Sequence, residues 1–377
     1  MRFTLVHTAH DCAARAGVLE LTHGVAPTPV FMPVGTQASV KSLDSMDLAA
    51  LDAAIILCNT FHLFLRPGPE TIAALGGIHA FMQWPRPVLT DSGGFQIFSL
   101  AALSKVSEKG VAFQSPLDGS RHLFTPENVI DIQRAIGADI IMCLDECTEY
   151  PADFNRAAAS MAMTERWARR CKARWEDNNP HDQALFGIVQ GGVHETLRRE
   201  SAAGLAALDF PGYAVGGVSV GESREEMAAA TRWATDSLPT TKPRYLMGVG
   251  TPEDMLTGIE HGIDMFDCVM PTRNARHGNL FTSTGRLNIK NARFARDDTP
   301  LDATCGCPVC RVYSRAYLSH LFRAGELTAL RLNTLHNLFF MIQLAVQARE
   351  AICNNRYVAF KRAFLQAYNQ PDETNEC

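Results

Sequence analysis

The sequence predicts an α/β protein whose core is a closed (β/α)8 TIM barrel, with an insertion near the C-terminus. Eight short apolar segments rich in β-branched residues recur along the first three-quarters of the chain. Several are continuously apolar, as expected for parallel strands covered on both faces, and helix-forming segments lie between most of them. Such a barrel takes about 250 residues, so a chain of 377 residues has room for an additional subdomain.

The eight predicted strands are short. They cover residues 30–34, 54–58, 88–91, 139–145, 185–190, 213–217, 244–249 and 264–267. The main alternative is an open doubly wound sheet. That alternative is weakened because no G-x-G-x-x-G motif follows the first strand, where a dinucleotide-binding sheet would carry it.

Capping patterns mark several of the helices between these strands. Thr125-Pro126-Glu127 places an N-cap residue before a proline at the first helical position, and Gly137 supplies a stop. Thr251-Pro252-Glu253 repeats the pattern, with Gly262 as its stop. Two further segments have the spacing of long amphipathic helices, at 153–174 and 222–238.

Three cysteines stand close together after the eighth strand. Cys305, Cys307 and Cys310 lie within six residues, and His336 follows on a segment that is predicted to be helical. Three thiolates and one imidazole fill a tetrahedral zinc shell, which leaves no open position, so the zinc would be structural. Buried thiols without a metal are the alternative, which the density of cysteines disfavours. On spacing alone, His320 competes with His336 for the fourth position.

The same region has a hairpin-like stretch at 280–287 and a helical segment, followed by a last helix at 356–368. We therefore expect residues 1–377 to form a single barrel domain, with residues 279–353 as a zinc-binding subdomain inserted before the last helix.

Composition and charge limit the class of protein. The net charge of −5 excludes a basic surface over the whole molecule, so any nucleic-acid contact must be a local patch. The first residues lack the apolar core of a signal peptide. The apolar stretch at 335–348 is too short and too polar to span a bilayer. We expect a soluble cytoplasmic protein, in which eleven cysteines indicate thiols and a metal rather than disulfides.

Polar or glycine-rich sequence follows six successive predicted strands. These segments are Thr90-Asp91-Ser92-Gly93-Gly94-Phe95-Gln96, Leu144-Asp145-Glu146-Cys147, Val189-Gln190-Gly191-Gly192, Val215-Gly216-Gly217, Leu246-Met247-Gly248-Val249-Gly250 and Asp267. The active site of a barrel enzyme lies at the carboxyl ends of its strands. Asp91 alone could be a turn residue and Asp145 a helix cap, but six such strand ends together are better explained by one site.

The residue types at these ends suit a flat, polar ligand. Glycines let a ligand approach the backbone closely. Asp and Gln side chains match the donors and acceptors on the edge of a purine. Phe95 and Met247 could sandwich its ring.

The segment that begins at Asp267 indicates the chemistry. A carboxylate at a strand end can act as a nucleophile. Arg273, Asn274 and Arg276 follow on what we expect to be an irregular loop bounded by Gly278, and such side chains hold phosphate and sugar oxygens. Together they suggest covalent chemistry on a sugar within a nucleic acid. The alternative is a strand, a turn and a solvated basic loop.

These residues together resemble the bacterial tRNA-guanine transglycosylases, or queuine tRNA-ribosyltransferases. The resemblance runs from about residue 16 to residue 365. It is carried by the motifs Thr90–Gln96, Val189–Gly192, Gly216-Gly217-Val218-Ser219-Val220-Gly221-Glu222, Tyr245–Gly250 and Phe266–Arg273, and by the Cys305, Cys307, Cys310 and His336 set. It implies a zinc-bearing (β/α)8 barrel that exchanges guanine for a 7-deazaguanine at the wobble position of tRNA, usually as a homodimer.

The resemblance also implies roles for individual residues. Asp267 matches the family nucleophile and Asp91 the general acid/base, while His336 gains support as the fourth zinc ligand. The expected base-binding residues are Asp91, Ser92, Gly93, Gly94, Phe95, Asp145, Gln190, Gly217 and Met247. The expected RNA contacts are Gly248, Val249, Gly250, Thr251, Pro252, Glu253 and Asp254 in one segment, and Thr272, Arg273, Asn274, Ala275 and Arg276 in the other.

Small departures refine the expectation. Phe95 stands where some members have Tyr, and Cys147 and Val220 match the bacterial pattern, which implies 7-aminomethyl-7-deazaguanine as the incoming base. Two other functions remain as alternatives. A catalytically silent tRNA-binding subunit is opposed by the presence of both Asp91 and Asp267. A barrel glycoside hydrolase is opposed because none of the four tryptophans stands at a strand end.

Overall fold

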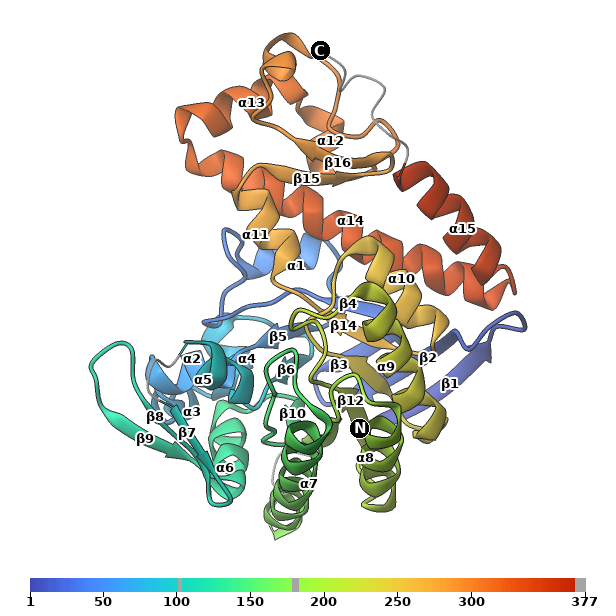
Figure 1. Ribbon diagram of the computed structural model, residues 1–377. Coiled ribbons are helices and arrows are strands. Elements are labelled where there is room, and N and C mark those ends of the chain that lie inside the picture. The colour runs from blue at the N-terminus through green and yellow to red at the C-terminus, as the bar shows by residue number, and fades with distance from the viewer. Residues whose placement is uncertain (101–103, 178–182, 370–377) are drawn as a thin grey trace.

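Eight parallel strands form the centre of the molecule in the computed structural model, which describes residues 1–100, 104–177 and 183–369 (Figure 1). They are β4 (Val30–Met32), β5 (Ile56–Cys58), β6 (Val88–Thr90), β10 (Ile140–Met142), β11 (Ala184–Val189), β12 (Gly212–Val215), β13 (Arg244–Leu246) and β14 (Met265–Asp267). All eight fall within or beside the predicted segments. Their order is β4-β14-β13-β12-β11-β10-β6-β5.

The two ends of this sheet meet. The N–H of Leu57 donates to the carbonyl of Pro33 at 3.0 Å, and the N–H of Gly35 donates to that of Leu57 at 2.6 Å. The barrel is therefore closed between β4 and β5, and the predicted fold class is confirmed. Alternate residues of the strands, such as Met142, Phe186 and Met265, fill the interior with apolar side chains.

A three-stranded antiparallel sheet covers the N-terminal end of the barrel. It consists of β1 (Arg2–Thr8), β2 (Arg15–Leu21) and β3 (Gly24–Thr28). Leu19 and Ala26 of this sheet join the apolar cluster of the barrel interior. Arg15 forms a buried ion pair with Asp264 at the start of β14. The sheet thus closes the end opposite the predicted site, and sequence analysis did not anticipate it.

Most of the helices cover the outside of the barrel (Figure 1). The long ones are α6 (Pro126–Ile136), α7 (Phe154–Asp177), α8 (Glu195–Ala207), α9 (Arg224–Ser237) and α10 (Pro252–Glu260); the shorter ones are α1 (Ser45–Ala50), α2 (Thr60–Leu65), α3 (Pro69–Ala74), α4 (Gly77–Met82) and α5 (Gly94–Leu100). Of these, α2 and α5 contribute residues to a cavity at the carboxyl ends of the strands. The predicted cap of α6 is present: Thr125 and Asn128 form a reciprocal capping box, and Gly137 ends the helix with a φ of 83°.

A second antiparallel sheet lies between β6 and α6. Its strands are β7 (Ser104–Ser107), β8 (Gly110–Gln114) and β9 (Arg121–Phe124). The guanidinium groups of Arg166 and Arg170 on α7 donate to the Glu108 carboxylate and carbonyl respectively. These bonds tie the turn between β7 and β8 to the barrel.

The segment after β14 corrects one prediction. Residues 272–276 do not form an irregular loop, because α11 (Met270–Arg276) is a helix. Pro271 near its start has a backbone angle already suited to a helix. Pro271, Thr272 and Ala275 are buried on one face, and Asn337 donates to the Pro271 carbonyl at 2.9 Å. Tertiary packing thus orders a segment that looked irregular in the sequence.

The C-terminal part begins with the hairpin of β15 (Asn279–Thr282) and β16 (Gly285–Asn288), followed by the 3₁₀ helix η1 (Ala292–Arg296), α12 (Pro308–Val312), α13 (Arg315–Ala324), α14 (Leu327–Cys353) and α15 (Tyr357–Tyr368). We call the part formed by β15, β16, η1, α12 and α13 the C-terminal cap. The N-terminal part of α14 packs against this cap, whereas its C-terminal half contacts β2 and β4 (Figure 1). One helix therefore belongs to both parts, and the boundaries 279–353 of the inserted subdomain remain a prediction.

Candidate active site

A cavity of about 490 Å³ opens at the carboxyl ends of the barrel strands. Its lining includes many of the residues expected from the sequence: Asp91, Ser92, Gly93, Gly94, Phe95, Asp145, Gly217, Met247, Gly248, Asp267 and Arg273. Residues from β6, β10, β12, β13 and β14 thus converge, as the barrel prediction requires.

Asp267 is the last residue of β14 and is 9 % exposed. Its Oδ1 accepts hydrogen bonds from the Tyr245 hydroxyl at 2.5 Å and from the Gly248 N–H at 2.8 Å. Burial raises the pKa of Asp267, and these two donors partly offset that effect. Burial and the nearby Asp267 charge raise the pKa of Tyr245 well above its usual value, so the phenol remains a donor.

Asp91 directly follows β6 and is held by the beginning of α2. Its two carboxylate oxygens accept from the Asn59 amide at 2.6 Å and from the Thr60 N–H at 2.8 Å. The pKa of Asp91 is raised to about 6, chiefly by burial and also by the charge of Asp267. The hydrogen bonds from Asn59 and Thr60 partly offset this rise. A carboxyl group that titrates near neutral pH can both give and take a proton.

Asp145 follows β10 and lies next to Ser92, the residue after Asp91. Its oxygens accept from the Ser92 hydroxyl at 3.2 Å and from the Gln190 amide at 2.7 Å. Burial raises the pKa of Asp145 to about 6, and the charge of Asp91 adds to the effect. A Cβ at Gly94 would lie 2.7 Å from the Asp145 carbonyl, so only glycine fits there.

Gln190 is not part of the cavity lining. It lies behind Asp145, and its amide orients that carboxylate. Phe95, at 48 % exposure, and the partly buried Met247 both line the cavity. Sequence reasoning gave no role to Tyr245, Asn59 or Thr60, because their partners are 22 to 32 residues away along the chain.

The two segments expected to contact RNA are only partly accessible. Gly248 lines the cavity, but Val249 and Pro252 are buried, as are Thr272 and Ala275. Thr251 caps α10 by accepting from the Asp254 N–H at 3.0 Å. Glu253 and Asp254 both lie within ion-pair distance of Arg224.

Arg273 and Arg276 remain the cations of this region. Arg273 is exposed at the cavity mouth. Arg276 is half-buried and donates to the Thr272 carbonyl at 3.2 Å, while Asn274 lies half-buried between them.

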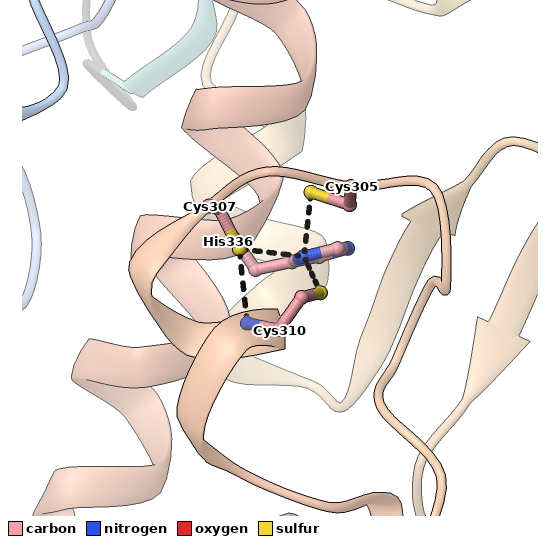
Figure 2. Close-up of side chains that lie close together, drawn as sticks. All are labelled: Cys305, Cys307, Cys310 and His336. Carbon is pink, nitrogen blue, oxygen red and sulfur yellow. Dashed lines mark hydrogen bonds between the residues drawn. The ribbon is translucent and has the colours of Figure 1, made fainter.

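Three thiols surround one imidazole nitrogen in the C-terminal cap (Figure 2). His336 Nδ1 lies 3.9, 3.5 and 3.3 Å from the Sγ atoms of Cys305, Cys307 and Cys310. The other ring nitrogen of His336 lies 2.6 Å from the Phe281 carbonyl. That carbonyl accepts a hydrogen bond from a proton on Nε2, so the lone pair of Nδ1 faces the thiols. Metal-binding histidines are commonly oriented by a hydrogen bond of this kind.

This donor set fits a tetrahedral zinc ion. The competing His320 is exposed on α13 and takes no part in the group. The ambiguity between the two histidines is thereby resolved in favour of His336.

His23, His79 and Asp139 form a second cluster, near the N-terminal end of the barrel. The Asp139 carboxylate lies 2.9 Å from His23 Nδ1 and 3.0 Å from His79 Nε2, and it also accepts the Val88 N–H at 2.9 Å. The two rings are stacked at 3.5 Å with 17° between their planes. Lone pairs in stacked planes do not converge on one ion, so this arrangement suits two N–H donors to one carboxylate.

Among the described residues, no helix has the length and apolarity needed to cross a membrane.

Comparison with known proteins identifies relatives over nearly the whole chain. The family model described as "Queuine tRNA-ribosyltransferase" matches residues 11–370. A protein of that name from Caldanaerobacter subterraneus is 56 % identical over 355 residues, which cover 94 % of each chain. One from Herpetosiphon aurantiacus is 55 % identical over 97 % of this chain and 92 % of its own. One from Thermoanaerobacter sp. is 52 % identical over 99 % of both. The chain belongs to the queuine tRNA-ribosyltransferase family.

Proposed function

We propose that this protein exchanges guanine at the wobble position of tRNA for 7-aminomethyl-7-deazaguanine, through a covalent intermediate on Asp267. Family membership supports a tRNA-guanine transglycosylase of queuosine biosynthesis. The observation that carries the finer proposal is the position of Asp91 and Asp267, two buried carboxylates at strand ends that face one cavity.

In the first half of the reaction, the Asp267 carboxylate attacks C1′ of the ribose. The bond between C1′ and the guanine nitrogen breaks, and its electron pair stays with the departing base. Asp91, whose pKa of about 6 leaves a protonated fraction near neutral pH, supplies a proton to that base. The hydrogen bonds from Tyr245 and Gly248 stabilise the charged form of the nucleophile before the attack.

In the second half, the incoming base loses a proton to Asp91 and its nitrogen attacks C1′. The ester bond to Asp267 breaks and the carboxylate is regenerated. Two inversions at C1′ restore the original configuration, as in retaining glycosidases. Because one glycosidic bond replaces another, the exchange needs no ATP and no redox cofactor.

Base recognition would use the remaining polar groups of the cavity. The Asp145 carboxylate, oriented by Gln190 and Ser92, suits the N–H donors of a guanine edge. Phe95 and Met247 offer apolar contact to a ring. The wobble nucleotide must leave its stack to enter such a cavity.

Arg273 and Arg276 would hold the flanking phosphates. A zinc ion in the Cys305, Cys307, Cys310 and His336 site would stabilise the cap, and its filled shell places it outside the chemistry. We also propose that the protein is a cytoplasmic homodimer. Equilibrium sedimentation would test the dimer.

Labelled guanine and an unmodified anticodon stem-loop provide the test. The wild-type protein should incorporate label, and a denaturing gel should show a protein–RNA adduct that Asp267→Asn does not form. Glu146→Gln, a change near the site but outside the cavity lining, should still form the adduct. An adduct in the Asp267→Asn protein would disprove the assignment of the nucleophile.

A further inference from the structure

A fully buried guanidinium lies behind the base cavity. Arg198, on α8, is 0 % exposed and does not line the cavity. Its Nε donates to the Gly192 carbonyl at 2.6 Å, Nη1 to Val189 at 3.2 Å and Gly216 at 2.7 Å, and Nη2 to Gly217 at 2.9 Å. All four acceptors are backbone carbonyls at the ends of β11 and β12.

Burying this charge is costly. Burial lowers the pKa of Arg198 to about 10. Among the described residues Arg198 has no ion pair with a carboxylate; the charge of Glu222 acts from a longer distance and only partly offsets the burial. Packing alone would be served better by an apolar side chain of similar volume. Packing alone therefore does not explain why a charged arginine is buried against these four carbonyls.

The contacts with Gly216 and Gly217 determine which way two peptide groups point. Cis peptide bonds occur only before Pro29, Pro67 and Pro151 among the described residues, so the bonds around 216–218 are trans. In a trans peptide the carbonyl and the following N–H point in opposite directions. Carbonyls turned toward Arg198 direct the N–H groups of Gly217 and Val218 away from it.

Arg198 does not line the cavity, whereas the backbone that it holds does, so the guanidinium and the cavity lie on different sides of this segment. Gly216, Gly217 and Val218 line the cavity. In the part of the chain that the structure describes, neither the Gly217 nor the Val218 N–H has a hydrogen-bond partner. Gly217 has a φ of 61°, and a Cβ there would lie 2.1 Å from Gln190 Oε1, so only glycine fits at this position of the cavity lining.

We propose that Arg198 is a positioning residue for the base exchange: by holding the Gly216 and Gly217 carbonyls, it presents the next two N–H groups to the exocyclic 6-oxygen of a purine base. The inference rests on the proposed function and deepens it, because it assigns a role in base selectivity to a residue outside the cavity lining. An arginine is required because its planar fork reaches several carbonyls at once, which a lysine ammonium does not.

The selectivity of the cavity for different bases tests the proposal. Unlabelled guanine, hypoxanthine and 2-aminopurine compete with labelled guanine for exchange into the stem-loop. 2-Aminopurine lacks the 6-oxygen, whereas hypoxanthine keeps it and lacks the 2-amino group. For Arg198→Met we expect the KM for guanine to rise about tenfold and the preference for guanine over 2-aminopurine to fall by a similar factor. The preference for guanine over hypoxanthine should remain unchanged.

Arg198→Lys and Arg349→Met serve as controls. Lys keeps the charge and should give an intermediate KM, even if the Met variant does not fold. Arg349 also holds two carbonyls, those of Gly17 and Thr28, but at the opposite end of the barrel. Arg349→Met should lower the melting temperature without changing base selectivity.

A purely structural role for Arg198 would overturn the proposal. In that case both Arg198 variants would lower the melting temperature or the active fraction but keep the wild-type preference for guanine over 2-aminopurine. A wild-type protein that incorporates no labelled guanine would instead disprove the proposed function. Calorimetric titration of wild-type and variant proteins with guanine and 2-aminopurine measures the same selectivity without any exchange.

Discussion

Three aspartates of one cavity have different partners, and their partners determine their chemistry. Asp267 is bound by a phenol and a backbone N–H, Asp91 by an amide and a helix N-terminus, and Asp145 by a hydroxyl and an amide. Burial raises the pKa of all three. The donors keep each group close to ionisation despite its burial, which is the condition that nucleophilic and acid–base roles require.

Tyr245→Phe should therefore impair the proposed nucleophile without removing it. The hydroxyl stabilises the ionised form of Asp267, so its loss raises the pKa of Asp267 further. Because attack needs the carboxylate, activity falls as the pH drops through this pKa. We expect a kcat about tenfold lower and an acid limb of the pH–rate profile displaced to higher pH.

The matched control is Tyr213→Phe. Tyr213 is also a fully buried barrel tyrosine, but its hydroxyl accepts the Phe210 N–H, away from the cavity. This variant should lose stability and keep the wild-type pH profile. Equal displacement of both acid limbs would contradict the role of the Tyr245 hydrogen bond.

At the scale of elements, the metal cluster joins the C-terminal cap to α14. Cys305 precedes α12, Cys307 and Cys310 lie at its start, and His336 belongs to α14, with its ring bonded to β15. A metal ion bound by these four side chains would link the cysteine turn directly to α14.

Removal of the metal should destabilise the cap. The free energy of zinc binding contributes directly to folding where the site forms only in the folded state. Dialysis against a chelator, or Cys310→Ser, should lower the melting temperature and increase hydrogen exchange in residues 305–312. Protection in β11 and β12 should persist, and Cys353→Ser, an exposed thiol outside the cluster, should behave like the wild type. A cap that remains fully protected without metal would contradict the prediction.

At the scale of the molecule, contacts between distant segments complete the barrel. His23 lies between β2 and β3, His79 in α4 and Asp139 before β10, and the shared carboxylate ties them together. Burial alone would raise the pKa of Asp139, but the donors of His79, Val88 and His23 outweigh it, and the pKa is lowered.

The Asp139 carboxylate should therefore stabilise the fold in a pH-dependent way. A lowered pKa in the folded state means that its contribution is present above the pKa of the unfolded chain and is lost as the pH falls through the folded-state value. Asp139→Asn should reduce the free energy of unfolding at pH 7 by roughly 2–4 kcal/mol. The difference from the wild type should shrink in acid, as urea titrations at several pH values would reveal. A constant difference would exclude the carboxylate charge as the cause.

Local patterns predicted the eight strands, because a buried parallel strand is a short apolar run whatever it pairs with. The acidic strand ends followed from the barrel, since all strands end on one face. The β1–β3 sheet, α11, Tyr245 and Arg198 escaped prediction for a common reason. Each depends on a partner elsewhere in the chain, such as Asn337 for α11 or Gly216 for Arg198, and no local pattern names that partner.

The length of α14 connects two ends of the molecule mechanically. Arg349 lies thirteen positions after His336, a rise of about 20 Å along one continuous helix. Arg349 donates hydrogen bonds to the Gly17 and Thr28 carbonyls of the N-terminal sheet. A continuous helix such as α14 moves as a rigid unit, so a displacement at one end is transmitted to the other. A shift of the cysteine-bearing turn would therefore be transmitted through α14 to the N-terminal sheet. The positions of the C-terminal cap and of this sheet are coupled through one helix.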